Sequence, residues 1–149
     1  MTCFFRRKFI FKLFQALFLI SFGGMVYYNF EILFRGFSHF SMILCGGLSF
    51  YVIGLLNEGN RHPSFLLQMF AGSLIILFFE YITGSIVNLN FHLMVWDYSD
   101  VPFNFQGQIC LPFFFLWFFL TPICILADDY IRFALFGRKK PVYRTGKTL

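Results

Sequence analysis

Residues 64–88 read SFLLQMFAGSLIILFFEYITGSIVN, and this stretch decides the class of fold. A helix needs about 20 predominantly apolar residues to cross a bilayer, so the stretch is long enough to span a membrane. Glu80 is an ionisable residue inside this apolar run. An ionised carboxylate there costs about 2.5–3.5 kcal/mol on insertion scales. Glu80 therefore needs a partner, a bound proton or a water-filled cavity.

The composition of the whole chain indicates that its solvent is lipid. Of the 149 residues, 58% are hydrophobic, 23% aromatic and 13% charged, whereas soluble domains carry about 25% charged residues. A water-soluble fold of this length has too little interior to bury so much apolar surface. We expect a single membrane domain over residues 1–149.

Four apolar stretches are candidate membrane spans: residues 9–31, 39–57, 64–88 and 108–127. The first begins like a signal peptide, with basic residues before apolar ones. No clear cleavage site follows it, so we interpret it as a retained span. The predicted fold is an all-α, polytopic bundle of four transmembrane helices.

Basic residues predict the orientation of this bundle. Lys and Arg crowd both ends of the chain, at Arg6, Arg7, Lys8 and Lys12 and in a basic tail, residues 138–149. Because such residues favour the cytoplasmic side, both termini are predicted to be cytoplasmic, which fits an even number of spans. Residues 89–107 contain no Lys or Arg and are expected outside. Basic residues placed around apolar runs favour the lipid bilayer, and not nucleic acid, as a partner.

Small residues and cysteines fit a role in helix packing. The pairs Gly23-Gly24 and Gly46-Gly47 are predicted to let helices approach closely. Pro122 is expected to kink the fourth span or to free a backbone carbonyl. The cysteines show no metal-ligand spacing, so we expect free thiols and no metal or other cofactor, with a Cys45–Cys110 disulfide as the alternative.

Helical periodicity predicts where Glu80 points. Gly72, Gly84 and Asn88 lie on roughly the same helix face as Glu80, at multiples of about one turn. This face is small and polar, so Glu80 is expected to point toward the other helices. Internal ionisable groups in membrane helices indicate a functional site. The alternative is a buried carboxyl that only fixes the helix register.

Other polar residues are predicted to gather at the outer end of the bundle. Arg35 or His39 is a candidate partner for Glu80, although Glu31 and Arg35 are also four residues apart and suited to pair. We infer an outward-facing polar pocket with Glu80 at its floor. Its candidate substrate-binding residues are Glu80, Glu31, Asn88, Trp96, Asp97, Asn104 and Gln108.

The outer stretch WDYSDVPFNFQGQIC, residues 96–110, has two interpretations. Its aromatic residues suit the membrane interface and its Asp, Ser and Pro residues suit a turn. Alternatively it is a lid over the pocket, with Asp97 and Asn104 as ligands. On the inner side, Asn57 and Glu58, with Arg61 and His62, are expected to cap a tight, solvated turn.

Several stretches together resemble a known family: GFSHFSMILCGGLSFYVIGLLNE at residues 36–58, EYITGSIVN at residues 80–88, and WDYSDVPFNFQGQICLPFFFLWF at residues 96–118. DDYIRF at residues 128–133 adds to the resemblance, and Asp128 and Arg132 are spaced to pair. These stretches are similar to small bacterial integral membrane proteins named putative ABC transporter permease, type IV or CmpB-like.

The resemblance covers roughly residues 24–141 and implies a multi-span fold in the bacterial plasma membrane. It also implies that the family's motif positions carry over to this chain. These are Glu31, Asn57, Glu58, Glu80, Gly84, Asn88, Trp96, Asp97, Tyr98, Asn104, Gly107, Gln108 and Cys110.

Three functions compete at this point. The first is a permease-like transport component, as a homo-oligomer or with a larger membrane-protein partner, in which Glu80 binds a cation, proton or polar solute. The second is an accessory subunit of an envelope complex that transports nothing itself. The third is a membrane enzyme using Glu31, Glu80 and Asp97 as acid and base, which the absence of any recognised nucleophile or metal motif disfavours.

Overall fold

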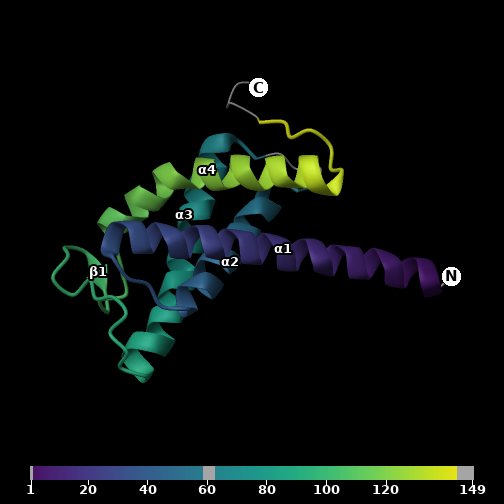
Figure 1. The fold of residues 1–149 in the computed structure, drawn as a ribbon. Coiled ribbons are helices and arrows are strands. Elements are labelled where there is room, and N and C mark those ends of the chain that lie inside the picture. The colour runs from purple at the N-terminus through teal and green to yellow at the C-terminus, as the bar shows by residue number, and fades with distance from the viewer. Residues whose placement is uncertain (1, 59–62, 144–149) are drawn as a thin grey trace.

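The structure is a computed structural model that describes residues 2–58 and 63–143, with side chains described from Arg6 onward (Figure 1). Two parts of the chain lie outside the described residues: Arg61 and His62 of the expected inner turn, and residues 144–149 of the basic tail.

The described chain is almost entirely helical, which confirms the predicted all-α membrane fold. The α-helices are α1 (Thr2–Arg35), α2 (Ser41–Gly54), α3 (Phe65–Gly84) and α4 (Leu111–Phe136). A 3-10 turn, η1 (Leu55–Asn57), extends α2, and a π-helical segment, η2 (Ser85–Asn90), extends α3. Two short antiparallel strands, β1 (Asn104–Phe105) and β2 (Ile109–Cys110), precede α4.

Three of the described helices are long and apolar enough to cross a membrane: Arg6–Arg35, Phe65–Asn90 and Leu111–Phe136. The apolar helix Ser41–Asn57 is shorter. The chain enters α4 later than expected, at Leu111 and not at residue 108, because Pro at the first turn favours a helix start there. The helix then continues past the predicted end of the span at residue 127 to Phe136 and ends at Gly137, whose φ of 64° is the left-handed conformation typical of a C-cap.

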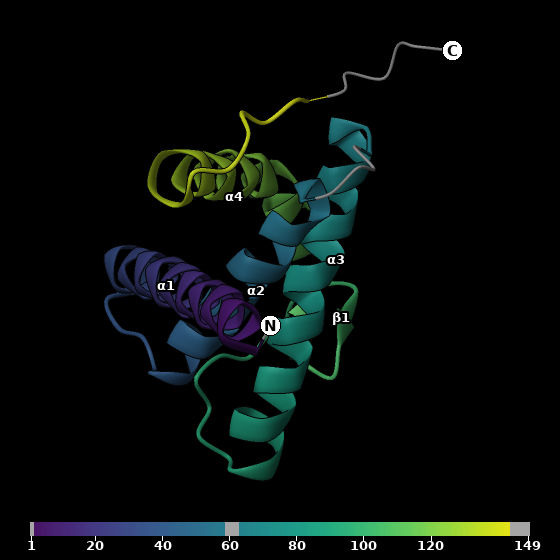
Figure 2. The same ribbon diagram turned by 90° about the vertical axis from the view of Figure 1, so that its right-hand side faces the viewer.

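The helices are arranged as two crossing pairs. In Figures 1 and 2, α1 and α4 run alongside each other, and α2 and α3 cross them steeply. Although it is short, α2 packs against all three other helices. The predicted glycine contacts are present where it crosses α1: Gly24 faces the backbone of Ile43, and Gly47 faces the backbone of Ile20. A Cβ at either glycine would overlap a carbonyl oxygen, so this close crossing requires glycine.

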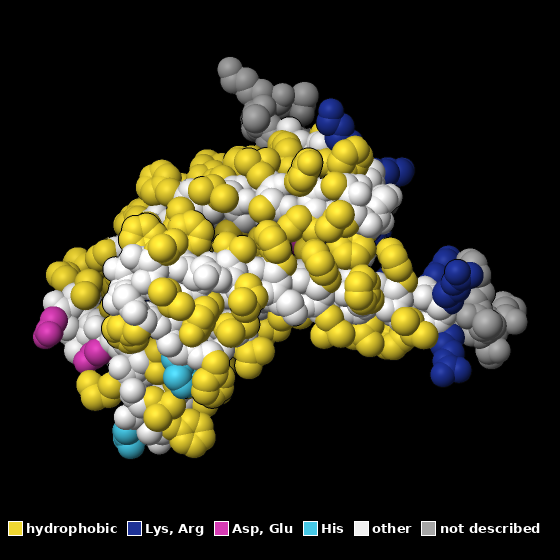
Figure 3. All heavy atoms as spheres, in the orientation of Figure 1, with side chains coloured by type: hydrophobic (Ala, Val, Ile, Leu, Met, Phe, Trp, Pro, Cys, Tyr) yellow, Lys and Arg dark blue, Asp and Glu magenta, His cyan; other side chains and the backbone are white. Residues whose placement is uncertain are grey.

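The polarity of the bundle is that of a protein in lipid. Large hydrophobic side chains cover the face seen in Figure 3, and basic side chains lie at the end opposite the acidic ones. On α3 the exposed residues include Leu66, Phe70, Leu74 and Phe78. Six of the eight buried positions of α3 and η2 recur every four residues and are mostly small or polar: Gln68, Gly72, Ile76, Glu80, Gly84 and Asn88. The other two are Ser73 and Val87.

The two ends of the bundle have different contents. At the end called here the hairpin end, α1 ends, α2 begins, and residues 91–110, the hairpin segment, connect η2 to α4. At the other end, the tail end, α2 finishes in η1, α3 begins, and α4 leads into residues 138–143. The prediction that the hairpin end lies outside the cell stays a prediction.

Candidate functional site

Glu80 is enclosed by the bundle, as its helix face predicts. Its side chain is 2% exposed, and its Oε2 accepts a hydrogen bond of 3.1 Å from the indole Nε1 of Trp117 on α4. A buried indole N–H needs an acceptor. In a chain whose outer surface is apolar, the two residues satisfy each other between α3 and α4.

Neither candidate basic partner reaches Glu80. Arg35 forms an ion pair with Glu31 at 2.7 Å and donates to the backbone carbonyl of Val95 at 2.6 Å. The His39 ring contacts the hydroxyl of Ser41 at the start of α2. The ion pairs within the described residues involve Glu31, Glu58 and Asp128 and leave Glu80 without a cationic side chain.

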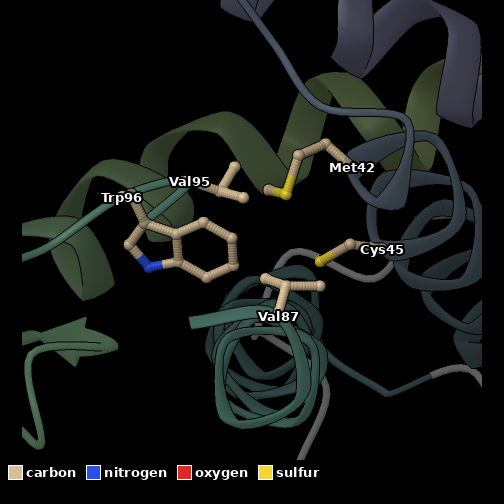
Figure 4. Packing of buried hydrophobic residues seen from close by; sticks show 5 residues of the cluster. All are labelled: Met42, Cys45, Val87, Val95 and Trp96. Carbon is tan, nitrogen blue, oxygen red and sulfur yellow. The ribbon is translucent and has the colours of Figure 1, made fainter. Parts of the chain in front are cut away.

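An apolar cluster separates Glu80 from the hairpin end. It consists of Met42, Cys45, Val87, Val95 and Trp96, which face one another in Figure 4. Two of these residues come from α2, one from η2 and two from the hairpin segment, so the segment itself covers the bundle. Glu80 is occluded in this conformation, and an opening toward the outer side stays a prediction.

A second apolar cluster lies on the other side of Glu80. Ile53 of α2, Ile76 of α3 and Ile125 of α4 pack together, and Trp117 packs against them. We call these three side chains the isoleucine layer. Tyr27 of α1 lies beside Trp117, with 5.9 Å between ring centroids, and within electrostatic range of Glu80. The carboxyl therefore lies between two apolar layers, lined by aromatic rings.

Three of the predicted site residues hold the hairpin segment on the bundle. Asn88 donates to the carbonyl of Trp96 at 2.9 Å and to Oε1 of Gln108 at 2.8 Å, and its own oxygen accepts from the amide of Val95 at 2.7 Å. The indole of Trp96 donates to the carbonyl of Gln108 at 2.9 Å. Gly84 provides the space, because a Cβ there would overlap Gln108. These contacts form a buried latch, made of Asn88, Trp96 and Gln108.

The other predicted residues of the hairpin segment shape its turns. Asp97 is exposed and accepts hydrogen bonds from the amide and the hydroxyl of Ser99. The hydroxyl bond first, and then the amide bond, lower the pKa of Asp97 below its ordinary value. Asn104 donates to the carbonyl of Val101 at 2.8 Å and accepts from the amide of Gly107. Both residues lie apart from the buried carboxyl of Glu80.

At the tail end, the expectation of solvated caps was wrong for Asn57. It is buried and donates to Oδ2 of Asp129 at 2.8 Å. The same oxygen accepts from the hydroxyl of Tyr143, which the returning tail brings next to it at 2.8 Å. Sequence spacing did not reveal this contact, because α2 and α4 meet only in the folded bundle. Glu58 lies closer to solvent and pairs with Arg138 at 3.3 Å.

The predicted Asp128–Arg132 pair is confirmed. Both side chains are buried, and Nε of Arg132 donates to Oδ2 of Asp128. Cys45, Cys110 and Cys124 are free thiols, so the alternative of a Cys45–Cys110 disulfide was wrong. Within the described part of the chain, no group of three or more His, Cys, Asp or Glu side chains is placed to hold a metal ion.

Comparison with known proteins identifies the family. Residues 16–135, most of the chain, match the model of a family described as putative ABC-transporter type IV. The chain belongs to this family. No curated protein matches the chain, and no solved structure does. Membership of the type IV family, together with the long apolar helices, identifies a membrane protein related to ABC transporters.

The sequence did not reveal two partner residues of this type IV family member, Trp117 and Tyr143. Trp117 lies in a run of phenylalanines, where it is easily interpreted as one more apolar ring. The signal that was available is its N–H group, which an apolar span cannot satisfy by itself. Tyr143 lies in the predicted basic tail, and its hydroxyl gave no sign of an internal partner.

Proposed function

We propose that this protein is a permease-like transport component in which Glu80 binds a proton. The observation that supports this is a carboxyl buried between apolar layers, with one indole donor and no cationic partner among the described residues. Burying a charge in this way is costly unless the charge is paired or neutralised. A group that must bind a positive ion in order to be neutral is suited to carrying one.

The contacts of Glu80 favour a proton over a metal cation. A hard cation needs about six oxygen ligands. Glu80 instead meets an indole donor. The other groups described within electrostatic range of it are the hydroxyls of Tyr27 and Tyr98, the thiol of Cys45 and the carboxylate of Glu31, which is too few oxygen ligands for such an ion. A carboxyl with few oxygen neighbours is a poor cage for an ion but a sufficient site for a proton.

The hairpin segment is the part of the site suited to act as a lid. It contributes Val95 and Trp96 to the apolar cluster above Glu80, and it is held by the latch and by the bond from Arg35 to Val95. These few polar contacts are replaceable by water when the segment moves. Its opening would admit water to Glu80, which we propose as the outward-facing state of the bacterial plasma-membrane protein.

Flux across vesicle membranes tests the proposal. The purified protein is reconstituted in liposomes with a pH-sensitive dye inside, and a proton gradient is imposed. Wild type should conduct protons. Glu80→Gln should reduce the proton flux at least tenfold while keeping its melting temperature. The matched control is Asp100→Asn, which removes a carboxylate from an exposed position of the hairpin segment. Wild-type flux in a folded Glu80→Gln protein would refute the proposal.

The family description suggests the competing function, an accessory subunit of a larger transporter. In that case the reconstituted protein conducts nothing by itself, in either variant, and a stoichiometric partner copurifies in mild detergent. Sodium, potassium and a neutral solute are tested in the same vesicles, so that a carrier of another ion or solute is recognised as such.

A further inference from the structure

A second buried carboxyl lies at the tail end of the same helix that holds Trp117. Asp128 is 0% exposed and follows Trp117 by three turns of α4, about 16 Å along the helix axis. Its Oδ2 is taken by Arg132, whereas its Oδ1 has no hydrogen-bond partner in the described structure. The carboxyl packs directly on Gly54 of α2, where a Cβ would overlap it.

The groups around Asp128 leave an excess of negative charge. Asp129 and Glu58 act on it together with Arg132, and Arg138 pairs with Glu58. Among the residues that the structure describes, three carboxylates therefore face two guanidinium groups, a sum of −1. A nearby acceptor, Oδ1 of Asn57, is also buried without a partner, as is the donor Nη2 of Arg132. Unpaired buried acceptors in a negative cluster favour binding of a positive species.

The isoleucine layer lies between this cluster and Glu80. In each helix that contributes to the layer, the isoleucine has one residue about a turn before it and one about a turn after it. These two residues are either both polar, or one is polar and the other is a glycine. The series are Ser49 and Ile53 on α2 with Asn57 on η1; Glu80, Ile76 and Gly72 on α3; and Thr121, Ile125 and Asp128 on α4. Glu80 lies one turn from Ile76 on α3, and Asp128 lies about one turn from Ile125 on α4. One apolar cluster, shared by three helices, therefore connects the surroundings of the two carboxyls.

We propose that Asp128 is a second proton site, on the tail side, and that the isoleucine layer is the barrier between it and Glu80. This inference rests on the proposed function of Glu80. The O–H bond of the Glu80 carboxyl breaks, the proton passes along water that enters the layer, and a new O–H bond forms at Oδ1 of Asp128. Apolar constrictions of this kind gate by excluding water until they widen.

Variants of the barrier give the sharpest test. Ile125→Ala shortens one side chain of the layer, and Ile123→Ala on the same helix is its control, because Ile123 is 63% exposed and lies outside the layer. In the liposome assay, Ile125→Ala should raise proton flux severalfold, and Ile123→Ala should leave it unchanged. Adding Glu80→Gln to Ile125→Ala should abolish the extra flux, because both act on one path.

Variants of Asp128 test the second site. Asp128→Asn alone leaves Arg132 buried and unpaired, so the variant to use is Asp128→Asn with Arg132→Gln. Once this double variant is shown to be folded, its proton flux should be at least tenfold lower than that of the wild type. If it does not fold, the isoleucine variants still decide whether a barrier exists.

The outcomes separate the two proposals. Wild-type flux in Glu80→Gln overturns both. Loss of flux in Glu80→Gln, together with wild-type flux in the folded double variant, overturns the role of Asp128 alone. Unchanged or reduced flux in a folded Ile125→Ala protein overturns the barrier.

Discussion

The indole of Trp117 donates a hydrogen bond of 3.1 Å to the buried carboxyl of Glu80, and this bond joins α3 to α4 in the middle of the bundle. Through the ring of Trp117 the pair contacts the isoleucine layer on one side and Tyr27 of α1 on the other. A single polar contact therefore lies where all four helices meet.

Trp117→Phe removes the donor and keeps most of the ring. A hydrogen bond to a carboxylate contributes about 1.5–3 kcal/mol, so we expect proton flux to fall by roughly tenfold or more. The fold should persist, because the phenyl ring still packs on the isoleucine layer. The liposome assay measures the effect, with Phe115→Leu on the exposed side of α4 as control. Wild-type flux in Trp117→Phe would show that the bond does not position the carboxyl.

Asn88→Asp tests the latch of the hairpin segment. The substitution removes the amide donor that serves the carbonyl of Trp96 and Oε1 of Gln108. Each orphaned acceptor costs about 1–3 kcal/mol. We expect faster amide hydrogen exchange throughout residues 91–107. Asn90→Asp, two residues further along η2 at an exposed position, is the control. Equal exchange in the two variants would contradict the latch.

Arg132→Gln tests the buried ion pair at the tail end. It leaves the buried carboxyl of Asp128 without its guanidinium partner, and breaking a buried pair in this way costs about 3–5 kcal/mol. Arg138→Gln breaks a pair in which Arg138 is 44% exposed, and it should cost about 0–1 kcal/mol. Unfolding in mixed micelles with increasing denaturing detergent measures both. Similar losses of stability in the two variants would argue against burial of the Asp128–Arg132 pair.

Gly47→Ala tests the crossing of α1 and α2. The added methyl group would overlap the carbonyl oxygen of Ile20, so the helices must separate. Overpacking of this kind costs about 1–3 kcal/mol, against a gain of about 1 kcal/mol from the higher helix propensity of Ala. The same unfolding assay should show net destabilisation, whereas Ser21→Ala on the exposed face of α1 should be nearly neutral. A more stable Gly47→Ala protein would show that the crossing is looser than the structure has it.

Sequence periodicity was sufficient for the faces of the helices. The spacing of Gly72, Glu80, Gly84 and Asn88 places them on one side of α3 and its extension η2, and all of them are buried. The prediction holds because an apolar exterior and a regular helix together leave one face for small and polar residues. Asp128 and Arg132 pair for the same local reason, since they are one turn apart.

Contacts between helices were harder to predict, because they depend on how far each helix slides past its neighbour. Glu80 was expected to meet Arg35 or His39, but Arg35 lies at the end of α1 and is already held by Glu31 and Val95. The actual partner of Glu80 is Trp117, and the whole hairpin segment separates the two residues in the sequence. Asn57 meets Asp129 across an even longer separation. Neither register is encoded in local spacing.

Infrared difference spectroscopy tests the central claim most directly, because it detects carboxyl protonation without depending on flux. Infrared spectra of the reconstituted protein are recorded before and after the pH is raised, and the difference between them is taken. We predict a carboxylic acid band that disappears on deprotonation, is absent in Glu80→Gln and is retained in Asp100→Asn. A spectrum of Glu80→Gln that is identical to that of the wild type would contradict the account, because Glu80 would then exchange no proton.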